Sequence, residues 1–211
     1  SPAVEACPSC GARPRTPLVC EACGELLEPR TQPSPFEALG LGPVFPLDVP
    51  APRKRLLALS RALHPAFHAN ADAGKRRMAE DNTAALNAAF HVLADDLRRA
   101  DWLVRALGGP REDEERSMPG AFLQEVLEWN ETIEEARSPT PRSRPRTAPA
   151  NLPAELEKAR AEGVRRVTTV LTPLPAHGAA VLRAVRQELN GLRYVERALR
   201  EIGELQHDRH S

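Results

Sequence analysis

Apolar residues recur at spacings of three and four along most of the chain, which is the period of amphipathic α-helices. The run FEALGL at 36–41 predicts a short helical turn ended by glycine. A longer helix is predicted up to Leu63. Leu56, Leu59 and Leu63 fall on one buried stripe, and Arg53, Lys54 and Arg61 lie away from it. Further helices are predicted at about 73–94 and across DDLRRADWLVRALGG, 95–109.

The second half continues this pattern after a charged linker that contains proline and glycine, 110–120. The stretch SPTPRSRPRTAPANLP, 138–153, has the composition of a disordered insert. Helices are predicted at 121–137, about 154–171 and about 179–206, and the last carries the seam of an antiparallel bundle at Leu182, Val185, Leu189, Leu192, Val195, Leu199 and Ile202. Since no strand pattern of any length occurs, the sequence predicts an all-α fold.

The four cysteines lie close together near the start of the chain, at Cys7, Cys10, Cys20 and Cys23. Their spacing is C-x2-C-x9-C-x2-C, and a glycine follows each pair directly, which allows backbone amides to turn toward the sulfurs. Four thiolates from two such pairs make the closed tetrahedral site that structural zinc prefers. We therefore predict a zinc knuckle over residues 1–30 that supports the fold and catalyses nothing.

Other interpretations of these cysteines remain open at this point. Two disulfides would require an oxidising compartment, and nothing in the sequence indicates export. A redox pair would need one C-x-x-C in a βαβ setting, which is missing. An iron centre would use the same four ligands as zinc.

Composition and charge narrow the class of function. The chain has 29 basic and 29 acidic residues and only 4% aromatics, which argues against a general role in binding nucleic acids or membrane surfaces. No apolar run approaches the roughly 18 residues that span a bilayer. Glu128, Glu131, Glu134 and Glu135 are interpreted as a solvated helix face and not as paired acid and base, so we do not expect an enzyme.

Several segments together resemble the HscB family, the J-type co-chaperones of iron–sulfur cluster assembly. These segments are PFEALGL, LSRALHP, ALNAAFHVLADDLRRADWLV and AFLQEVLEWNE, which occur in the family's order and spacing. The resemblance covers roughly residues 34–137, and RYVERAL near the end extends it. Some members also carry a cysteine-rich metal knuckle in front. The resemblance implies a J-domain-like region at 34–109 and a C-terminal helical bundle at 121–211.

The resemblance also implies an adaptor with two partners. The J-domain would dock on a DnaK-type ATPase chaperone and stimulate its ATP hydrolysis, and the bundle would hold an IscU-like cluster scaffold protein. The residues that match the chaperone-docking positions are Arg53, Lys54, Arg61, His64 and Pro65. Those that match the scaffold-contacting positions are Leu123, Leu127 and Tyr194.

Helical periodicity agrees with the scaffold-contacting set. Phe122, Val126, Trp129 and Ile133 fall on one stripe of the helix at 121–137, whereas Leu123 and Leu127 are displaced from it by about 100°. Tyr194 likewise falls between two seam positions. These apolar side chains form a candidate partner patch, and the alternative is that they widen the core.

The chain departs from the family in its signature loop. J-domains carry His-Pro-Asp, but here Ala66 follows His64 and Pro65, and Phe67 stands where a basic residue is usual. Alanine cannot carry charge or accept a hydrogen bond from its side chain, which places ATPase stimulation in doubt. Asp72 is six residues further on and is not expected to substitute for the missing acid.

Two alternatives to a working co-chaperone follow. The first is a degenerate J-like protein that binds the scaffold or another client without driving a chaperone. The second is a nucleic-acid module built from the knuckle and the basic RSRPR at 142–146, which the neutral charge and missing aromatic platform disfavour. We expect a bacterial cytoplasmic protein, or one of the mitochondrial matrix if a presequence precedes Ser1.

Overall fold

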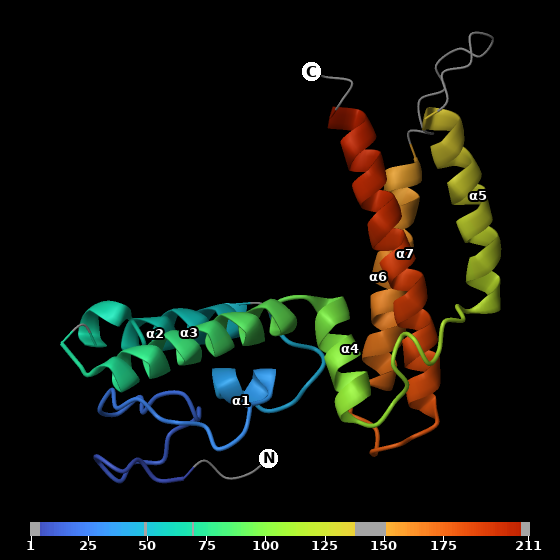
Figure 1. Ribbon diagram of the computed structural model, residues 1–211. Helices are drawn as coiled ribbons and strands as arrows, with labels where there is room; N and C mark the ends of the chain where they lie inside the picture. The colour runs from blue at the N-terminus through green and yellow to red at the C-terminus, as the bar shows by residue number, and fades with distance from the viewer. Residues whose placement is uncertain (1–4, 49, 69, 138–150, 208–211) are drawn as a thin grey trace. The chain divides into compact units, whose positions relative to one another are not determined.

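The computed structural model describes residues 5–48, 50–68, 70–137 and 151–207. Figure 1 shows a chain built from helices, as predicted. The described residues also contain one isolated β-bridge, between Val19 and Leu26. These residues fall into two compact units, Ser1–Arg99 and Ala100–Ser211. The helices are α1 (Pro35–Leu39), α2 (Pro50–Ala62), the 3-10 turn η1 (Pro65–His68), α3 (Ala73–Leu93), α4 (Asp96–Ala106), α5 (Gly120–Arg137), α6 (Leu152–Val170) and α7 (Val181–His207).

In the first unit, α2 and α3 form a helical hairpin with α1 packed against it. α1 is held by a capping box in which the Ser34 side chain and the Glu37 carboxylate each accept a backbone N–H of the other residue, and Gly40 ends it in the left-handed conformation. Of the leucines predicted to be buried on α2, Leu59 and Leu63 are fully buried and Leu56 is half-buried.

A buried arginine joins the loop before α2 to the start of α4. Arg99 is 1% exposed, and its guanidinium donates to the carbonyls of Phe45 at 2.7 Å and Leu93 at 2.5 Å and pairs with Asp96. The same guanidinium lies over the Phe45 ring, 5.2 Å from its centroid. A buried cation is tolerated here because each face of it has a partner.

In the second unit, α5 and α6 both pack on α7. Six of the seven predicted seam residues of α7 are buried, and Leu199 is half-buried at the edge of the core. Val126, Trp129 and Ile133 of α5 are buried against this core, with Phe122 packed edge-on to Trp129. The predicted stripe of α5 is therefore confirmed.

The segment at 110–117, which the sequence presents as a linker, is instead bound to α7. Asn190 is buried and donates from Nδ2 to the carbonyls of Glu115 at 2.8 Å and Ser117 at 2.9 Å. The Glu115 carboxylate is itself buried and accepts from Arg183 at 2.7 Å. Hydrogen bonds from polar side chains to backbone carbonyls leave no periodic pattern in the sequence. The proline and charged residues of this segment therefore suggest a linker.

The predicted disordered insert at 138–153 lies mostly outside the described residues, 138–150, and its last residues open α6, with Leu152 buried in the core. The division into 1–30, 34–109 and 121–211 stays a prediction. Within the described ranges, no helix combines the length and the apolar character needed to cross a membrane.

Candidate functional site

Each cysteine pair at the start of the chain sits on the same backbone turn. In the first, the Gly11 N–H donates to the Cys7 carbonyl and the Cys7 N–H donates to the Ala12 carbonyl, both at 2.8 Å. The second repeats these contacts thirteen residues later, with Gly24, Cys20 and Glu25 in the same roles and at the same distances. Gly11 and Gly24 have φ of 73° and 78°, which side chains other than glycine rarely adopt.

The two turns bring all four sulfurs within 4.8 Å of one another. The Sγ atoms of Cys7 and Cys23 are 3.6 Å apart, and those of Cys10 and Cys20 are 3.7 Å apart. These distances are too long for disulfides, which need about 2.05 Å. They match the sulfur–sulfur edge of about 3.8 Å in a zinc–thiolate tetrahedron with bonds of about 2.3 Å. The described residues therefore form a cysteine cluster that can hold a metal ion.

The thiols influence each other's acidity. Backbone N–H groups, that of Cys23 first, lower the pKa of Cys20 to about 7. The Glu25 N–H acts to lower the pKa of Cys23, but contacts with Cys10, burial and the remaining thiols raise it to about 12. The pKa of Cys10 is also raised. Because one thiolate discourages the next, a cation is needed for all four to be deprotonated together.

The knuckle is attached to the helices by a buried amide on α3. Asn82 is 4% exposed, and its Nδ2 donates to the carbonyls of Leu18 at 2.7 Å and Leu27 at 2.9 Å, on either side of the second cysteine pair. The sequence analysis overlooked this residue, although a signal existed. Asn82 falls at helical spacing between Ala79 and Leu86, on the buried face, where a polar side chain must find partners.

Two ion pairs support the same attachment. The Arg55 guanidinium on α2 lies 2.5 Å from the Glu21 carboxylate and donates to the Leu39 carbonyl at 2.8 Å. Lys75 on α3 lies 3.1 Å from Glu25. These bonds lower the pKa of both glutamates. Arg55 could not be singled out from the sequence, because its neighbours Arg53 and Lys54 have the same charge.

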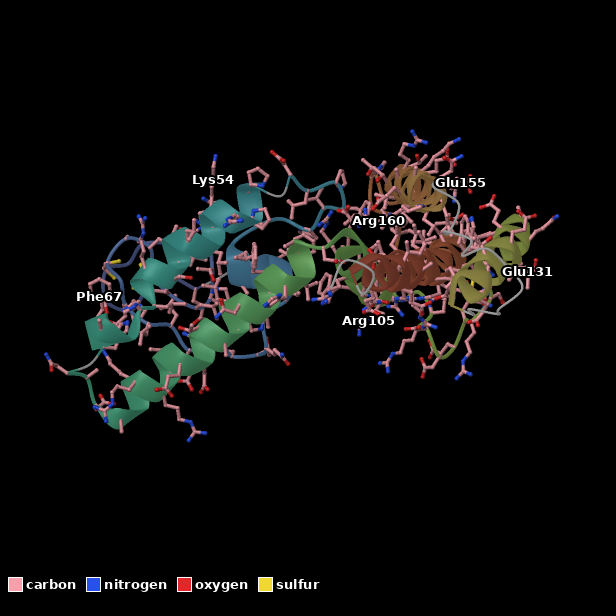
Figure 2. The ribbon with its side chains drawn as sticks, turned by 90° about the horizontal axis from the view of Figure 1, so that it is seen from above. Lys54, Phe67, Arg105, Glu131, Glu155 and Arg160 are labelled. Atoms are coloured by element: carbon pink, nitrogen blue, oxygen red, sulfur yellow. The ribbon has the colours of Figure 1, made fainter. Side chains whose placement is uncertain are left out.

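The predicted chaperone-docking residues lie on α2 and in the loop that follows it. Arg53, Lys54 and Arg61 are exposed on α2, and the Lys54 side chain projects from the helix in Figure 2. His64 is exposed just after the helix, and Pro65 begins η1. No acidic residue occurs within α2, so all the charged side chains that it exposes are cationic.

The His64-Pro65-Ala66 loop is closed by local bonds. His64 Nδ1 accepts the Ala66 N–H at 3.2 Å, and the His64 carbonyl accepts the Phe67 N–H at 3.0 Å. Asp72, the nearest acid that follows, accepts the Lys75 N–H at 2.9 Å as the N-cap of α3, and this bond lowers its pKa. Its carboxylate thus caps the helix, and that it does not replace the missing acid stays a prediction.

Of the predicted scaffold-contacting residues, two are exposed and one is half-buried. Leu123 and Leu127 are 48% and 63% exposed on α5, so the core does not absorb them. Tyr194 on α7 is half-buried against the core, and its hydroxyl donates to Asn130 Oδ1 of α5. Burial raises the pKa of Tyr194, which keeps the hydroxyl neutral as a donor. Tyr194 thus lies one helical turn before the buried Ala198 and joins α7 to α5 through its hydroxyl.

Comparison with known proteins identifies the family. The model of the HSCB C-terminal oligomerisation domain matches residues 118–203. The chain is 30% identical over 172 residues to the co-chaperone protein HscB homolog of Bordetella avium, covering 81% of this chain and 96% of that one. It is 31% identical over 140 residues to the homolog of Shewanella halifaxensis, covering 66% and 76%. The chain belongs to the HscB family. The family is one of co-chaperones and not of enzymes, as expected from the sequence.

Solved structures agree on the fold. The chaperone HscB from Vibrio cholerae aligns with a TM-score of 0.66 at 22% identity, over 83% of this chain and 99% of that one. The human co-chaperone protein HscB aligns with a TM-score of 0.73 at 20% identity, over 94% and 96%. The predicted all-helical HscB fold with a cysteine cluster in front is confirmed.

Proposed function

We propose that this HscB-family chain bridges a DnaK-type ATPase chaperone and an iron–sulfur cluster scaffold protein of the IscU type in the bacterial cytoplasm. One observation carries the proposal. The described residues include five large apolar side chains that are exposed: Leu57, Phe67, Leu123, Leu127 and Val181. Four of them lie on the two surfaces that the family resemblance implies, two on each. Exposed apolar side chains that gather on one surface are typical of interaction sites, whereas scattered single ones need no explanation.

The chaperone half is supported by the cationic face of α2 and the presented His64-Pro65 loop. Ala66 leaves the loop without a charged group, so we expect docking to persist and stimulation of ATP hydrolysis to be weak. The favoured alternative is a scaffold-binding protein that no longer drives the chaperone.

Steady-state ATP hydrolysis by the cognate chaperone separates these readings. The rate is measured with and without the chain and the scaffold, for the natural sequence and for Ala66→Asp. Stimulation by the natural sequence supports the co-chaperone function. If the natural sequence leaves the rate of ATP hydrolysis unchanged and Ala66→Asp raises it, the alternative is supported.

The scaffold half is tested by direct binding of the scaffold protein to the full chain. Leu127→Ala is expected to weaken binding by about tenfold, since a truncated apolar anchor costs more than about 1 kcal/mol. Gln124→Ala on the same helix, also exposed, serves as the matched control. If both variants bind the scaffold with the affinity of the natural sequence, Leu127 is not part of the scaffold-binding surface.

We further propose that the cysteine cluster holds one structural zinc ion. The sulfur distances and the closed set of four thiolates support zinc over a catalytic metal, which would need an open position. Elemental analysis of the purified chain distinguishes zinc from iron.

A further inference from the structure

The side of α2 that carries the predicted docking cations also carries an apolar ridge. Lys54, Leu57 and Arg61 follow one another at spacings of three and four, so they share a face of the helix. Leu57 lies between the two cations and is 55% exposed. His64, three residues after Arg61, continues the line beyond the end of the helix.

Phe67 extends this ridge and is the most exposed large apolar side chain of the described residues, at 76%. It stands on η1, with its ring edge-on to that of His64 at 6.4 Å between centroids. Figure 2 shows Phe67 at the outer edge of the first unit, beyond the end of the helix that carries Lys54. The sequence from 50 to 71 contains no acidic residue.

We propose that Phe67 and Leu57 are apolar anchors of the chaperone-docking surface, which insert into a hydrophobic depression bordered by acidic residues on the DnaK-type chaperone. This inference rests on the proposed function and names the residues that hold the partner in place of the absent aspartate. The cations provide steering and register, and the aromatic anchor provides the affinity.

Charge complementarity selects this occupant. Arg53, Lys54 and Arg61 surround the ridge without an acid among them, so a second copy of the same face would be repelled. An acidic protein surface satisfies the cations, and an apolar depression within it removes both side chains from water. A single-stranded nucleic acid would offer similar chemistry through phosphates and stacked bases, and is therefore included in the test.

The test measures the affinity of the full chain for the ATP-bound cognate chaperone at two salt concentrations. Phe67→Ala is expected to weaken binding about 30-fold and Leu57→Ala about fivefold, as for a central and a flanking anchor. Val181→Ala, an exposed apolar residue of the other unit, is the matched control and leaves the affinity unchanged. Arg61→Ala reduces the salt dependence, whereas Phe67→Ala leaves it intact.

Phe67→Lys separates an anchor from a surface that is read by charge alone. It weakens binding if Phe67 is an anchor, and it strengthens binding if the partner responds only to positive charge. If the Phe67→Ala variant binds the chaperone as tightly as the natural chain does, the inference is overturned and the proposed function still stands. If the natural chain does not bind the chaperone at all, both the inference and the proposed function are overturned. Binding of a labelled single-stranded oligonucleotide that Phe67→Ala abolishes would reassign the surface to nucleic acid.

Discussion

Replacing Asn82 by alanine should weaken metal binding at a site to which Asn82 contributes no ligand. The Asn82 amide donates to two backbone carbonyls of the knuckle, and it can do so only when the knuckle is folded. Small cysteine sites commonly fold on binding their metal, so we expect the thiolate turns to form together with the metal site. The free energy of the two hydrogen bonds is therefore part of the free energy of metal binding.

The size of the effect follows from the contacts. Each bond contributes about 1 kcal/mol net, and leaving a largely buried carbonyl with one partner fewer adds to the loss. The higher helix propensity of alanine offsets about 0.5 kcal/mol of this loss. A net loss of about 2 kcal/mol corresponds to a zinc affinity about 30-fold weaker.

Competition for zinc with a chromophoric chelator measures this affinity directly. Asn87→Ala, an exposed asparagine on the same helix, is the control and should bind zinc like the natural chain. After zinc removal, Asn82→Ala and the natural chain should melt at the same temperature, because the bonds are already lost. Equal zinc affinities of the Asn82 variant and the control would refute the coupling between α3 and the cysteine cluster.

Other outcomes test the second unit and the metal. Gly163→Ala should destabilise the bundle by about 1–2 kcal/mol in urea unfolding, since the added Cβ would lie 2.6 Å from the buried Leu192, whereas Gly203→Ala on α7 meets open space and should stabilise it. The Ser117 hydroxyl and N–H, and then Arg183, hold the pKa of Glu115 below its usual range. The ionised Glu115 therefore contributes to the free energy of unfolding above the ordinary pKa of a glutamate, and this contribution is lost as the pH falls through the depressed pKa. Glu115→Gln should flatten the acid end of a stability–pH profile. Removal of the bound metal by a chelator should speed hydrogen exchange in the knuckle while the amides of α6 and α7 stay protected.

The parts of the fold that sequence predicted are those set by apolar periodicity. The stripe of Val126, Trp129 and Ile133 and the seam of α7 are buried as the spacing requires, because a helix must turn its apolar side chains to the core. The displaced Leu123 and Leu127 are exposed for the same reason. Local spacing likewise predicted that the four cysteines would meet.

Long-range polar contacts are the part that sequence could not supply. Arg55 is one cation among several on α2, and only the fold places the carboxylate of Glu21 beside it. The attachment of Asn190 to the segment at 110–117 has the same character, because its partners are backbone carbonyls that every residue possesses. Asn82 is the exception, since a polar side chain on a buried stripe signals an unseen partner.

Under the proposed function, docking and stimulation would be separable properties of the surface on α2 and η1. Docking is an equilibrium, which the cations and the exposed Leu57 and Phe67 can support without an acid. Stimulation requires an interaction that strengthens as the chaperone approaches its hydrolytic transition state. The Ala66 side chain offers neither charge nor a hydrogen bond for that purpose, and the carboxylate of Asp72 is held by the Lys75 amide. Under the proposed function, we therefore expect a chain with this loop to dock on the chaperone while stimulating its ATP hydrolysis only weakly.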